Sequence, residues 1–441
     1  MKKLIPQPIK NIYHLIRSIG VAIWFGFPAR KLKVVGITGT NGKTTTTQMV
    51  AKILEEAGHK VAVSSTINFK LDKREWVNET KYTTRDAWQT QKFIRQAVEE
   101  KCGYLVLEVA SHALDQHRLW GIEFDVAVIT NATREHLDYH KTMEQYRAAK
   151  MKLFQMLKAN GGAVVNLEME KSGEFIKASR SQKIFGYQIK QSKLEAEFKN
   201  IEIVKAENLK LDLMGSSFSI DEEEFKLNLI GDFNVENALA AICVGLSQKI
   251  DLTICSQALA KIEKVPGRMD YVENNRGLKI IIDYALTPDS MEKLGKVVRA
   301  MVESGGKGQK NKEKGDLEVK SDNQIIWVFG SCGERDRGKR PLMGEIVSRY
   351  ADYAIVTNED PFGEDPKQII DEVFAGIKNM TEGEKSWRVM EREEAIRKAL
   401  SLAKRGDIVL VTGKGAEETM AIGKKRIRWN DKTVILNILA E

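Results

Sequence analysis

The stretch KVVGITGTNGKTTTT, residues 33–47, decides the fold class of this chain. Its first part, VVGIT, is a short β-branched run that predicts a buried strand. A glycine-containing loop follows, and residues 48–57 can form a helix that ends at Gly58. The order of strand, glycine-rich loop and helix is typical of an α/β domain that holds a phosphate group.

The loop itself has residues suited to a nucleotide. Its glycines allow backbone N–H groups to surround a phosphate, and the start of the helix adds a favourable dipole. Lys43 would contact the β- and γ-phosphates, and the Thr44 hydroxyl would contact Mg²⁺. The pattern GxxxxGK[ST] is not matched strictly, since Ile37 stands where its first glycine belongs. A glycine-rich turn without a ligand is the alternative, but the local context favours nucleotide binding.

Strand and helix patterns alternate along the rest of the chain, which predicts a largely parallel sheet covered by helices. Residues 158–230 are richer in short alternating runs, and PGR (266–268) marks a hinge into a second α/β unit. The strand candidates are VAVSST (61–66), YLVLEV (104–109), DVAVIT (125–130), LKIIIDYA (278–285), QIIWVFG (324–330), YAIVTN (353–358) and DIVLVTG (407–413), and helices are expected at 87–100 and 234–248.

We therefore expect three regions. Residues 1–33 form a basic amphipathic segment, 34–264 a central P-loop-type ATP-binding domain with a largely parallel sheet, and 265–441 a C-terminal Rossmann-like α/β domain. The composition, 42% hydrophobic and 29% charged over 441 residues, fits a globular protein and excludes collagenous, disordered and multi-span membrane classes. The four cysteines lie far apart without a CxxC pair, so neither a disulfide framework nor a structural zinc is expected, and a cytoplasmic location fits best.

The formal net charge of +8 is compatible with three kinds of partner: nucleic acid, a membrane surface or an anionic substrate. Part of the excess lies in residues 307–314, inside a Gly/Lys-rich stretch that predicts a solvated loop. No nucleic-acid-binding signature accompanies the charge, so we expect no nucleic-acid partner. Seven further cations open the chain before any acid: Lys2, Lys3, Lys10, Arg17, Arg30, Lys31 and Lys33.

The first thirty residues predict a helix. Apolar residues recur there at helical spacing, and the run IGVAIWFGF is too short to span a bilayer and lacks a signal-peptide cleavage site. Two interpretations remain open: a helix packed on the main body, or an interfacial membrane helix. The periodic residues are Ile9, Ile12, Leu15, Ile16, Ile19 and Ile23.

Two features between residues 104 and 157 point to chemistry. His112, His117, His136 and His140 lie within 29 residues, and Glu108 lies near the end of a strand. The carboxyl ends of parallel strands line the ligand crevice, so a carboxylate and an imidazole there could hold or orient Mg²⁺. Histidine is an uncommon Mg²⁺ ligand, however, and each of these residues taken alone would more often be structural.

Lys150 is the second feature, because it lies on the apolar face of a predicted helix. It is four residues from both Tyr146 and Phe154. A lysine in that position must extend its amine to solvent, pair with an acid, or be chemically altered.

Nine motifs together resemble the Mur ligase family, and most closely the branch that adds the third amino acid of the muramyl peptide. They extend from about residue 33 to near the C-terminus. They are GTNGKTTT, LEVASHALDQHR, TNATREHLDYHKTMEQYRAAKMKLF, GDFNVENALAA, PGRMD, DYALTPDS, FGSCGERDRGKRPLMGEI, EDPFGEDP and GKGAEE.

The resemblance implies an ATP- and Mg²⁺-dependent, ADP-forming amide ligase. ATP phosphorylates the terminal carboxylate of a muramyl-peptide precursor, the amine of a free amino acid attacks the acyl phosphate, and a tetrahedral intermediate releases phosphate. Such a site must gather and stabilise anions, which suits a lysine, loop amides and a divalent cation.

The resemblance also implies roles for individual residues. The catalytic residues would be Lys43, Glu108, His136 and Lys150, and the metal ligands Thr44, Glu108, His136 and Lys150, the last as a carbamate. ATP would contact Gly39, Thr40, Asn41, Gly42, Lys43, Thr44, Thr45, Asn237, Arg268 and Asp283. The muramyl peptide would contact Thr83, Thr84, Ser111, Gln116 and Arg118, and the amino acid Arg335, Glu359, Asp360, Gly413 and Glu417.

Three positions depart from the family pattern. A Ser-Ser-His motif reads Ala110 at its first position, and DYAHTPD has Leu286 in place of histidine. The DNPR motif of diaminopimelate-selective members has Phe362 in place of arginine, which removes a bidentate partner for a distal carboxylate. Glu359 and Asp360 would suit an amine, so we expect lysine or another diamino acid.

A fourth departure concerns the N-terminus. Family members usually carry a separate domain that binds the uridine nucleotide, and only about 33 residues precede the ATP-binding region here. We expect the nucleotide end to be held elsewhere, by a partner or near a membrane, and the protein to be a monomer. A related ligase acting on another carboxylate, by polyglutamylation or amidation, and an inactive ATP-binding regulatory module are the alternatives.

Overall fold

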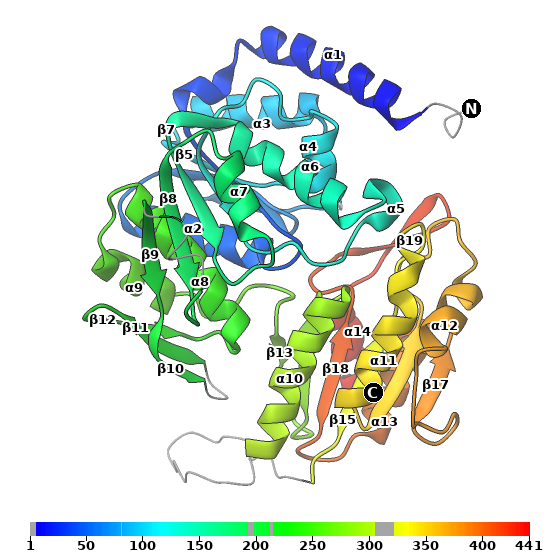
Figure 1. Cartoon of the computed structure of the whole chain (residues 1–441). Coiled ribbons are helices and arrows are strands. Elements are labelled where there is room, and N and C mark those ends of the chain that lie inside the picture. Colours follow the sequence, from blue (N-terminus) through cyan, green and yellow to red (C-terminus); the bar gives the residue numbers. More distant parts are fainter. Residues whose placement is uncertain (1–5, 81, 193–197, 199, 212–214, 305–321) are drawn as a thin grey trace. The chain divides into compact units, whose positions relative to one another are not determined.

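The computed structural model describes residues 6–80, 82–192, 198, 200–211, 215–304 and 322–441 (Figure 1). The chain divides into two compact units, which we treat separately. Unit 1 comprises Met1–Thr133 and His140–Glu263, and unit 2 comprises Arg134–Tyr139 and Lys264–Glu441. The predicted basic loop at residues 307–314 lies outside the described residues.

Unit 1 is built on a nine-stranded sheet. From β2 to β9 all neighbouring strands run parallel, and β3 and β4 add antiparallel strands at one edge. In sheet order the strands are β4 (Arg74–Val77), β3 (Asn68–Leu71), β2 (Val61–Ser64), β5 (Tyr104–Glu108), β1 (Lys33–Thr38), β6 (Phe124–Ile129), β7 (Leu157–Asn166), β8 (Lys183–Gln188) and β9 (Ile201–Lys205). The predicted parallel sheet is confirmed.

Helices and a small antiparallel sheet complete unit 1. The small sheet contains β10 (Glu207–Leu211), β11 (Ser216–Ile220) and β12 (Glu223–Leu227). The helices are α1 (Gln7–Phe25), η2 (Pro28–Lys31), α2 (Lys43–Glu56), α3 (Ala87–Glu99), α4 (Ser111–Asp115), α6 (Met143–Gln155), α7 (Ser172–Ala178), α8 (Asp232–Ser247) and α9 (Leu252–Ala260), and α5 (Leu137–His140) lies where the chain passes between units.

Helix α2 begins five residues earlier than the sequence predicted. The threonines at 44–47 are β-branched and have low helix propensity. In the structure all four are buried, so tertiary packing overrides that local preference. The helix consequently starts directly after Gly42, at the end of the phosphate loop.

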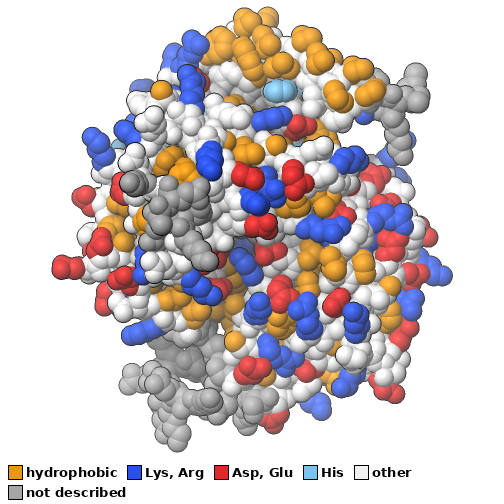
Figure 2. Space-filling model, viewed as in Figure 1, with side chains coloured by type: hydrophobic (Ala, Val, Ile, Leu, Met, Phe, Trp, Pro, Cys, Tyr) orange, Lys and Arg blue, Asp and Glu red, His pale blue; other side chains and the backbone are white. Residues whose placement is uncertain are grey.

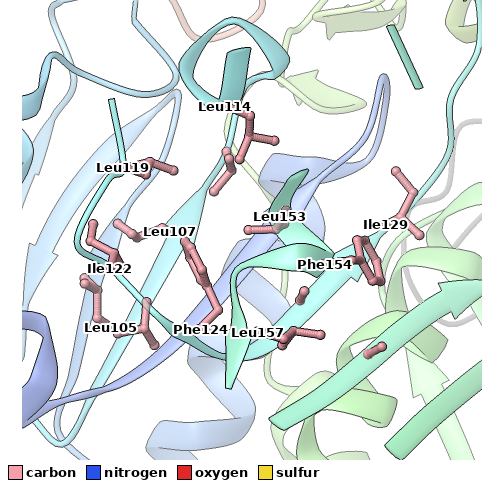
Figure 3. Packing of buried hydrophobic residues seen from close by; sticks show 14 of the residues in the cluster. Leu105, Leu107, Leu114, Leu119, Ile122, Phe124, Ile129, Leu153, Phe154 and Leu157 are labelled. Atoms are coloured by element: carbon pink, nitrogen blue, oxygen red, sulfur yellow. The ribbon is translucent and has the colours of Figure 1, made fainter. Parts of the chain in front are cut away.

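The core of unit 1 lies where β5, β6 and β7 meet α4 and α6 (Figure 3). The ring of Phe124 packs so close to β1 that a Cβ on Gly36 would lie 2.6 Å from it. The burial of each large apolar side chain stabilises the folded state by roughly 1.5–3 kcal/mol. The core therefore supplies a rigid support for the loops that follow β1, β5 and β6. The labelled residues are Leu105, Leu107, Leu114, Leu119, Ile122, Phe124, Ile129, Leu153, Phe154 and Leu157.

Helix α1 packs on unit 1, but not through the face that the isoleucine spacing suggested. It contacts α3, and its buried residues are Ser18, Val21 and Ala22. Ile12 and Ile16 are instead 58% and 65% exposed. Among the described residues we find no helix that is both long and apolar enough to cross a bilayer.

Unit 2 contains a six-stranded sheet and a two-stranded hairpin. The sheet is parallel except for β13, and in order its strands are β13 (Asp270–Val272), β14 (Lys279–Asp283), β18 (Ile408–Thr412), β15 (Ile325–Phe329), β16 (Tyr353–Thr357) and β17 (Ser386–Val389). The hairpin pairs β19 (Thr419–Ile422) with β20 (Lys425–Arg428). The helices are α10 (Pro288–Ser304), η4 (Arg337–Lys339), α11 (Arg340–Tyr350), α12 (Pro366–Phe374), α13 (Arg392–Leu402) and α14 (Asp431–Ala440). The predicted α/β fold class is confirmed for both units.

Candidate active site

The phosphate loop joins β1 to α2 and depends on two glycines. Gly42 has a φ of 82°, in the left-handed region that favours glycine. A Cβ on Gly42 would lie 2.2 Å from the Asn237 side chain, and one on Gly39 would lie 1.8 Å from the Thr130 hydroxyl. Any larger residue at either position would therefore displace the loop.

Two residues that the sequence analysis did not single out fix the loop from the end of β6. The Asn131 side-chain oxygen accepts hydrogen bonds from the backbone N–H groups of Thr40 (3.2 Å) and Asn41 (2.8 Å). The Thr130 hydroxyl donates to the Asn41 carbonyl at 2.6 Å. Thr130 is the last residue of the predicted strand DVAVIT (125–130) and Asn131 follows it, and a polar pair at the carboxyl end of a strand beside β1 was the available signal.

Lys43, Thr44 and Glu108 lie together at the carboxyl ends of β1 and β5. The Thr44 hydroxyl donates to Glu108 Oε2 at 3.1 Å, and Lys43 Nζ donates to the Thr40 carbonyl at 2.9 Å. Glu108 is 2% exposed and also accepts from the N–H (2.8 Å) and hydroxyl (2.9 Å) of Thr66. The structure thus brings a buried carboxylate, a hydroxyl and an amine to the phosphate loop.

Lys150 lies on α6 and is 1% exposed, so its amine does not extend to solvent. Its Nζ donates to the Gly39 carbonyl at 2.7 Å and lies 4.5 Å from the centre of the Tyr146 ring. The Tyr146 hydroxyl in turn lies 3.0 Å from the Thr40 hydroxyl. Lys150 is therefore hydrogen-bonded to the phosphate loop at Gly39, the first glycine of the loop.

The residues expected to contact the muramyl peptide form a connected group beside Glu108. Thr84 donates from its hydroxyl to the Glu108 carbonyl at 3.0 Å, and Thr83 lies 2.9 Å from the Thr66 hydroxyl. Arg118 donates to the Gln116 side chain at 2.9 Å and to the Thr84 carbonyl at 3.2 Å. Hydroxyl, amide and guanidinium groups of this kind suit a polar, anionic peptide.

The histidines do not form one cluster. His140 lies 3.0 Å from the Ser111 hydroxyl, and its ring centre is 5.4 Å from that of His112. Burial lowers the pKa of His140 from 6.5 to about 4. His117 instead lines a cavity with Leu119 and Trp120, and His136 belongs to unit 2.

Asn237, expected near the adenine, lies on α8 against the loop. It is buried, and its side chain accepts from the Thr46 hydroxyl at 3.3 Å and donates to Asn234 at 3.2 Å. These contacts link α8 to the first turn of α2.

In unit 2 several of the remaining candidates lie at the carboxyl ends of β14, β18 and β16, and β15 lies between β18 and β16 in the sheet. Asp283 ends β14 and accepts from the N–H groups of Met269 (2.8 Å) and Ala285 (2.7 Å). Burial raises the pKa of Asp283, and the neighbouring Arg268 partly offsets this. The Arg268 guanidinium lies 4.5 Å from the Tyr284 ring, so these residues form one group.

Glu359, Asp360, Gly413 and Glu417 form a second group around Lys414, which the sequence analysis did not assign a role. Lys414 is fully buried and pairs with Asp360 at 3.0 Å and with Glu417. Asp360 also accepts from the Ala421 N–H at 2.6 Å. Gly413 has a φ of 108°, and a Cβ there would lie 2.2 Å from Glu359 Oε2.

Glu359 differs from Asp360 in its partners. The Cys332 thiol donates to Glu359 Oε1 at 3.0 Å, while Glu359 Oε2 is buried without a hydrogen-bond partner in the described structure. Burial raises the pKa of this carboxyl, and Arg392 lowers it. Arg335 follows Cys332 closely in the sequence, and its guanidinium lies 5.6 Å from the centre of the Phe362 ring. An unsatisfied buried oxygen is a candidate contact for a ligand.

The segment Arg134–Tyr139 brings His136 into unit 2. Glu135, beside it, pairs with the fully buried Lys339 at 3.1 Å, and Lys339 also donates to the Leu286 carbonyl at 2.9 Å. Leu286 is the position where the family pattern has histidine. Neither Glu135 nor Lys339 was assigned from the sequence, since their pairing joins segments 204 residues apart.

Side-chain oxygen atoms beside the phosphate loop are the candidate ligands for a magnesium ion. The described residues contain no group of three or more His, Cys, Asp or Glu side chains arranged to hold a metal. Glu108 and Thr44 nevertheless present adjacent oxygen atoms beside the phosphate loop. Mg²⁺ in nucleotide sites is usually held by one or two protein oxygens together with phosphates and water, so this pair fits.

Comparison with known proteins gives consistent results. Residues 37–245 match the family described as Mur ligase middle domain, and residues 316–415 match Mur ligase, glutamate ligase domain. The chain is 38% identical over 424 residues to UDP-N-acetylmuramoyl-L-alanyl-D-glutamate--2,6-diaminopimelate ligase of Syntrophomonas wolfei, covering 95% of this chain and 80% of that protein. It is 37% identical over 433 residues to UDP-N-acetylmuramyl-tripeptide synthetase of a Roseiflexus species, covering 95% and 81%.

A solved structure agrees with these relatives. A UDP-N-acetylmuramoyl-L-alanyl-D-glutamate--2,6-diaminopimelate ligase structure superimposes with a TM-score of 0.57 at 31% identity, covering 93% of this chain and 78% of that one. The match thus extends across both units.

Proposed function

The chain belongs to the Mur ligase family and is an ATP-dependent amide ligase of peptidoglycan precursor synthesis, and we propose that it joins a diamino acid to the terminal carboxylate of a muramyl dipeptide. The observation that carries this proposal is the arrangement of Lys43, Thr44 and Glu108 at the phosphate loop, with Lys150 attached to the same loop. We propose the roles assigned from the sequence for these residues, and the division into domains at residues 33 and 264.

The first step is phosphoryl transfer from ATP to the acceptor carboxylate. The loop N–H groups and Lys43 bind the phosphates and compensate the charge that develops as the γ-phosphoryl group moves. A Mg²⁺ ion held by Thr44 and Glu108 supplies further compensation of phosphate charge when bound. Thr83, Thr84, Ser111, Gln116 and Arg118 orient the acceptor, so that its carboxylate oxygen faces the γ-phosphorus.

Lys150 acts in this proposal as a carbamate. The ammonium group first loses one proton, and addition of CO₂ to the resulting neutral amine forms an N–C bond and releases a second proton, so a cation becomes an anion that suits a cation-binding site. The carbamate nitrogen keeps one N–H, so the hydrogen bond to the Gly39 carbonyl can persist. Its burial supports this role, because a carbamate at the loop resists exchange better in a water-excluded site.

The second step is attack of an amine on the acyl phosphate, followed by loss of phosphate from the tetrahedral intermediate. Asp360 is paired with Lys414 and Glu359 retains an unsatisfied oxygen, so we assign the contact with the amino acid's ammonium group to Glu359. Arg335 supplies a guanidinium for a carboxylate. The Syntrophomonas wolfei relative and the solved structure are named for 2,6-diaminopimelate, but Phe362 replaces the family's arginine, and this favours lysine or another diamino acid with a single carboxylate.

The test is phosphate release from ATP in the presence of UDP-muramyl-dipeptide and, in separate reactions, lysine, diaminopimelate, ornithine or glutamate. Stimulation that requires both the dipeptide and one diamino acid would support the proposal and identify the amino acid. If glutamate is the one amino acid of the four that stimulates phosphate release, the polyglutamylating alternative is indicated. Bound ATP without stimulation by any pair would indicate the regulatory module, and wild-type activity of Glu108→Gln would contradict the site.

A further inference from the structure

Helix α1 presents an apolar face to solvent. Six large side chains on it are between 57% and 74% exposed, and hydrophobic side chains gather over α1 at the top of Figure 2. Their spacing of three and four residues places them on one side of the helix. They are Ile9, Ile12, Tyr13, Ile16, Ile23 and Trp24.

The orientation of this helix is fixed by the opposite side. Asn11 donates to Asp115 at 2.9 Å, and Arg17 pairs with Asp86 at 3.5 Å. Gly121 leaves room for Ala22, since a Cβ on Gly121 would lie 2.9 Å from the Ala22 Cβ. Polar and small residues therefore face the protein while the apolar residues face outward, the reverse of an ordinary surface helix.

Among the residues that the structure describes, the other exposed large hydrophobic side chains do not form a comparable surface. Most of them lie singly on other elements, as surface hydrophobic residues commonly do. Trp88 on α3 is the exception, because its ring lies 6.4 Å from that of Trp24 and 5.0 Å from that of Phe25. The apolar surface thus continues from α1 onto α3.

The charged residues of this part of the sequence are all basic, since residues 1–54 contain no Asp or Glu. At 100° per residue, Lys10 lies on one flank of the apolar face, and Arg17, on the same flank, is paired with Asp86 of the neighbouring α3 region. Arg30 and Lys31 follow in η2 and are exposed. An apolar strip with cations beside it and Trp and Tyr among its members complements a surface of anionic headgroups over hydrocarbon.

A cavity of about 580 Å³ opens in unit 1 near the end of α1 and adds to this apolar region. Phe27, Trp120, Ile122 and Met156 are among the residues that line it, together with Arg30. Its walls are suited to an acyl chain or an aromatic group, and its position places it beside the same surface.

We propose that α1 lies in the plane of an anionic lipid bilayer, with its outward face inserted at the headgroup boundary. Its 19 residues extend for roughly 28 Å along the surface at about 1.5 Å per residue, and Trp24 and Tyr13 lie at the depth that such amphipathic rings favour. The enzyme is then a peripheral membrane protein that is held by one helix and by adjacent cations.

The experiment measures co-sedimentation of the full chain with vesicles of phosphatidylcholine alone or with 30% phosphatidylglycerol. We expect binding to the anionic vesicles that weakens with salt. The variant Ile12→Asp/Ile16→Asp should lower the partition coefficient at least tenfold, and Arg30→Glu/Lys31→Glu at least threefold. Quenching of fluorescence by brominated lipid should be smaller in Trp24→Phe than in the wild type.

The control is Leu436→Asp, which places a single aspartate on a 45% exposed apolar position of α14 and should not alter binding. All variants should keep their far-UV circular dichroism and their ATP-dependent ligation of soluble substrates, so failure here is distinguishable from failure of the proposed function. No binding to anionic vesicles, or binding unchanged in the Ile12/Ile16 variant, would overturn the proposal. So would a dimer in light scattering that this variant dissociates, since the face would then bind a second copy.

Discussion

The carboxyl-terminal edges of the two large sheets are built from different kinds of contact. In unit 1, Glu108 accepts hydrogen bonds from hydroxyl and backbone N–H donors, and Lys150 donates to a backbone carbonyl. In unit 2, buried ion pairs dominate: Lys414 with Asp360, Lys339 with Glu135 and Arg392 with Asp431. At the unit 1 edge these charged groups contact neutral partners, and at the unit 2 edge the charged groups are paired with one another.

This difference bears on how each unit receives a charged ligand. A phosphate loop whose contacts are hydrogen bonds, rather than ion pairs, can accept the large negative charge of a nucleotide and its cation without first breaking ion pairs. The ion pairs of unit 2 are already satisfied, so they define the shape of the site before any ligand arrives. We therefore expect substitutions in unit 1 to affect catalysis most and those in unit 2 to affect stability.

The largest expected effect is on catalysis, from Lys150→Ala. Loss of the amine removes both the loop contact and the carbamate, and we expect the ligation rate to fall at least about 10³-fold, or about 4 kcal/mol. Added bicarbonate should not restore it. The control is Lys152→Ala on the same helix, whose half-buried amine pairs with Asp115 at 2.8 Å. Undiminished ligation by Lys150→Ala would contradict the carbamate assignment.

A large effect on stability is expected from Lys414→Met. The substitution leaves Asp360 and Glu417 without their buried cation, which costs about 3–5 kcal/mol of unfolding free energy. Urea unfolding of the whole chain measures this. Lys378→Met, which breaks an exposed pair with Glu345, should change stability by less than about 1 kcal/mol. If the two substitutions lower the unfolding free energy equally, the buried ion pair of Lys414 does not stabilise unit 2 more than an exposed pair does.

His140 should produce a smaller, pH-dependent effect in unit 1. Because burial lowers its pKa from 6.5 to about 4, the unfolded state binds the proton more readily between these values. Its contribution to stability is present above pH 6.5 and is lost as the pH falls towards 4. His140→Gln should flatten this dependence and cost about 1 kcal/mol at pH 7.5 through the weakened Ser111 contact. If the unfolding temperature depends on pH in the same way in His140→Gln and in the wild type, His140 does not make this contribution to stability.

The last effect concerns amino-acid selectivity. Phe362→Arg restores the guanidinium of the diaminopimelate-selective motif and should raise the ratio of kcat/KM for diaminopimelate over lysine about tenfold, or about 1.4 kcal/mol. Phe362→Leu removes the ring without adding charge and serves as the control. If the two variants have the same ratio, Phe362 does not determine selectivity.

The sequence predicted those parts that depend on contiguous residues. The parallel sheets, the phosphate loop and the proximity of Thr44 to Glu108 follow from strand order and from the rule that ligands bind at the carboxyl ends of parallel strands. The pairs Lys339–Glu135 and Arg392–Asp431 could not be predicted, because they join residues far apart in sequence and depend on side-chain burial. The sequence left two interpretations of α1 open for another reason: helical periodicity identifies an apolar face but not what covers it.

The short segment Arg134–Tyr139 has a practical consequence for anyone who would study the halves separately. The chain leaves unit 1 at Thr133, contributes six residues to unit 2, and returns at His140 before crossing finally at Glu263. No single cut yields both units intact. A fragment ending at residue 263 would retain Glu135 without Lys339, and its complement would contain a buried cation without its acid. Split expression of this ligase therefore needs co-production of both fragments.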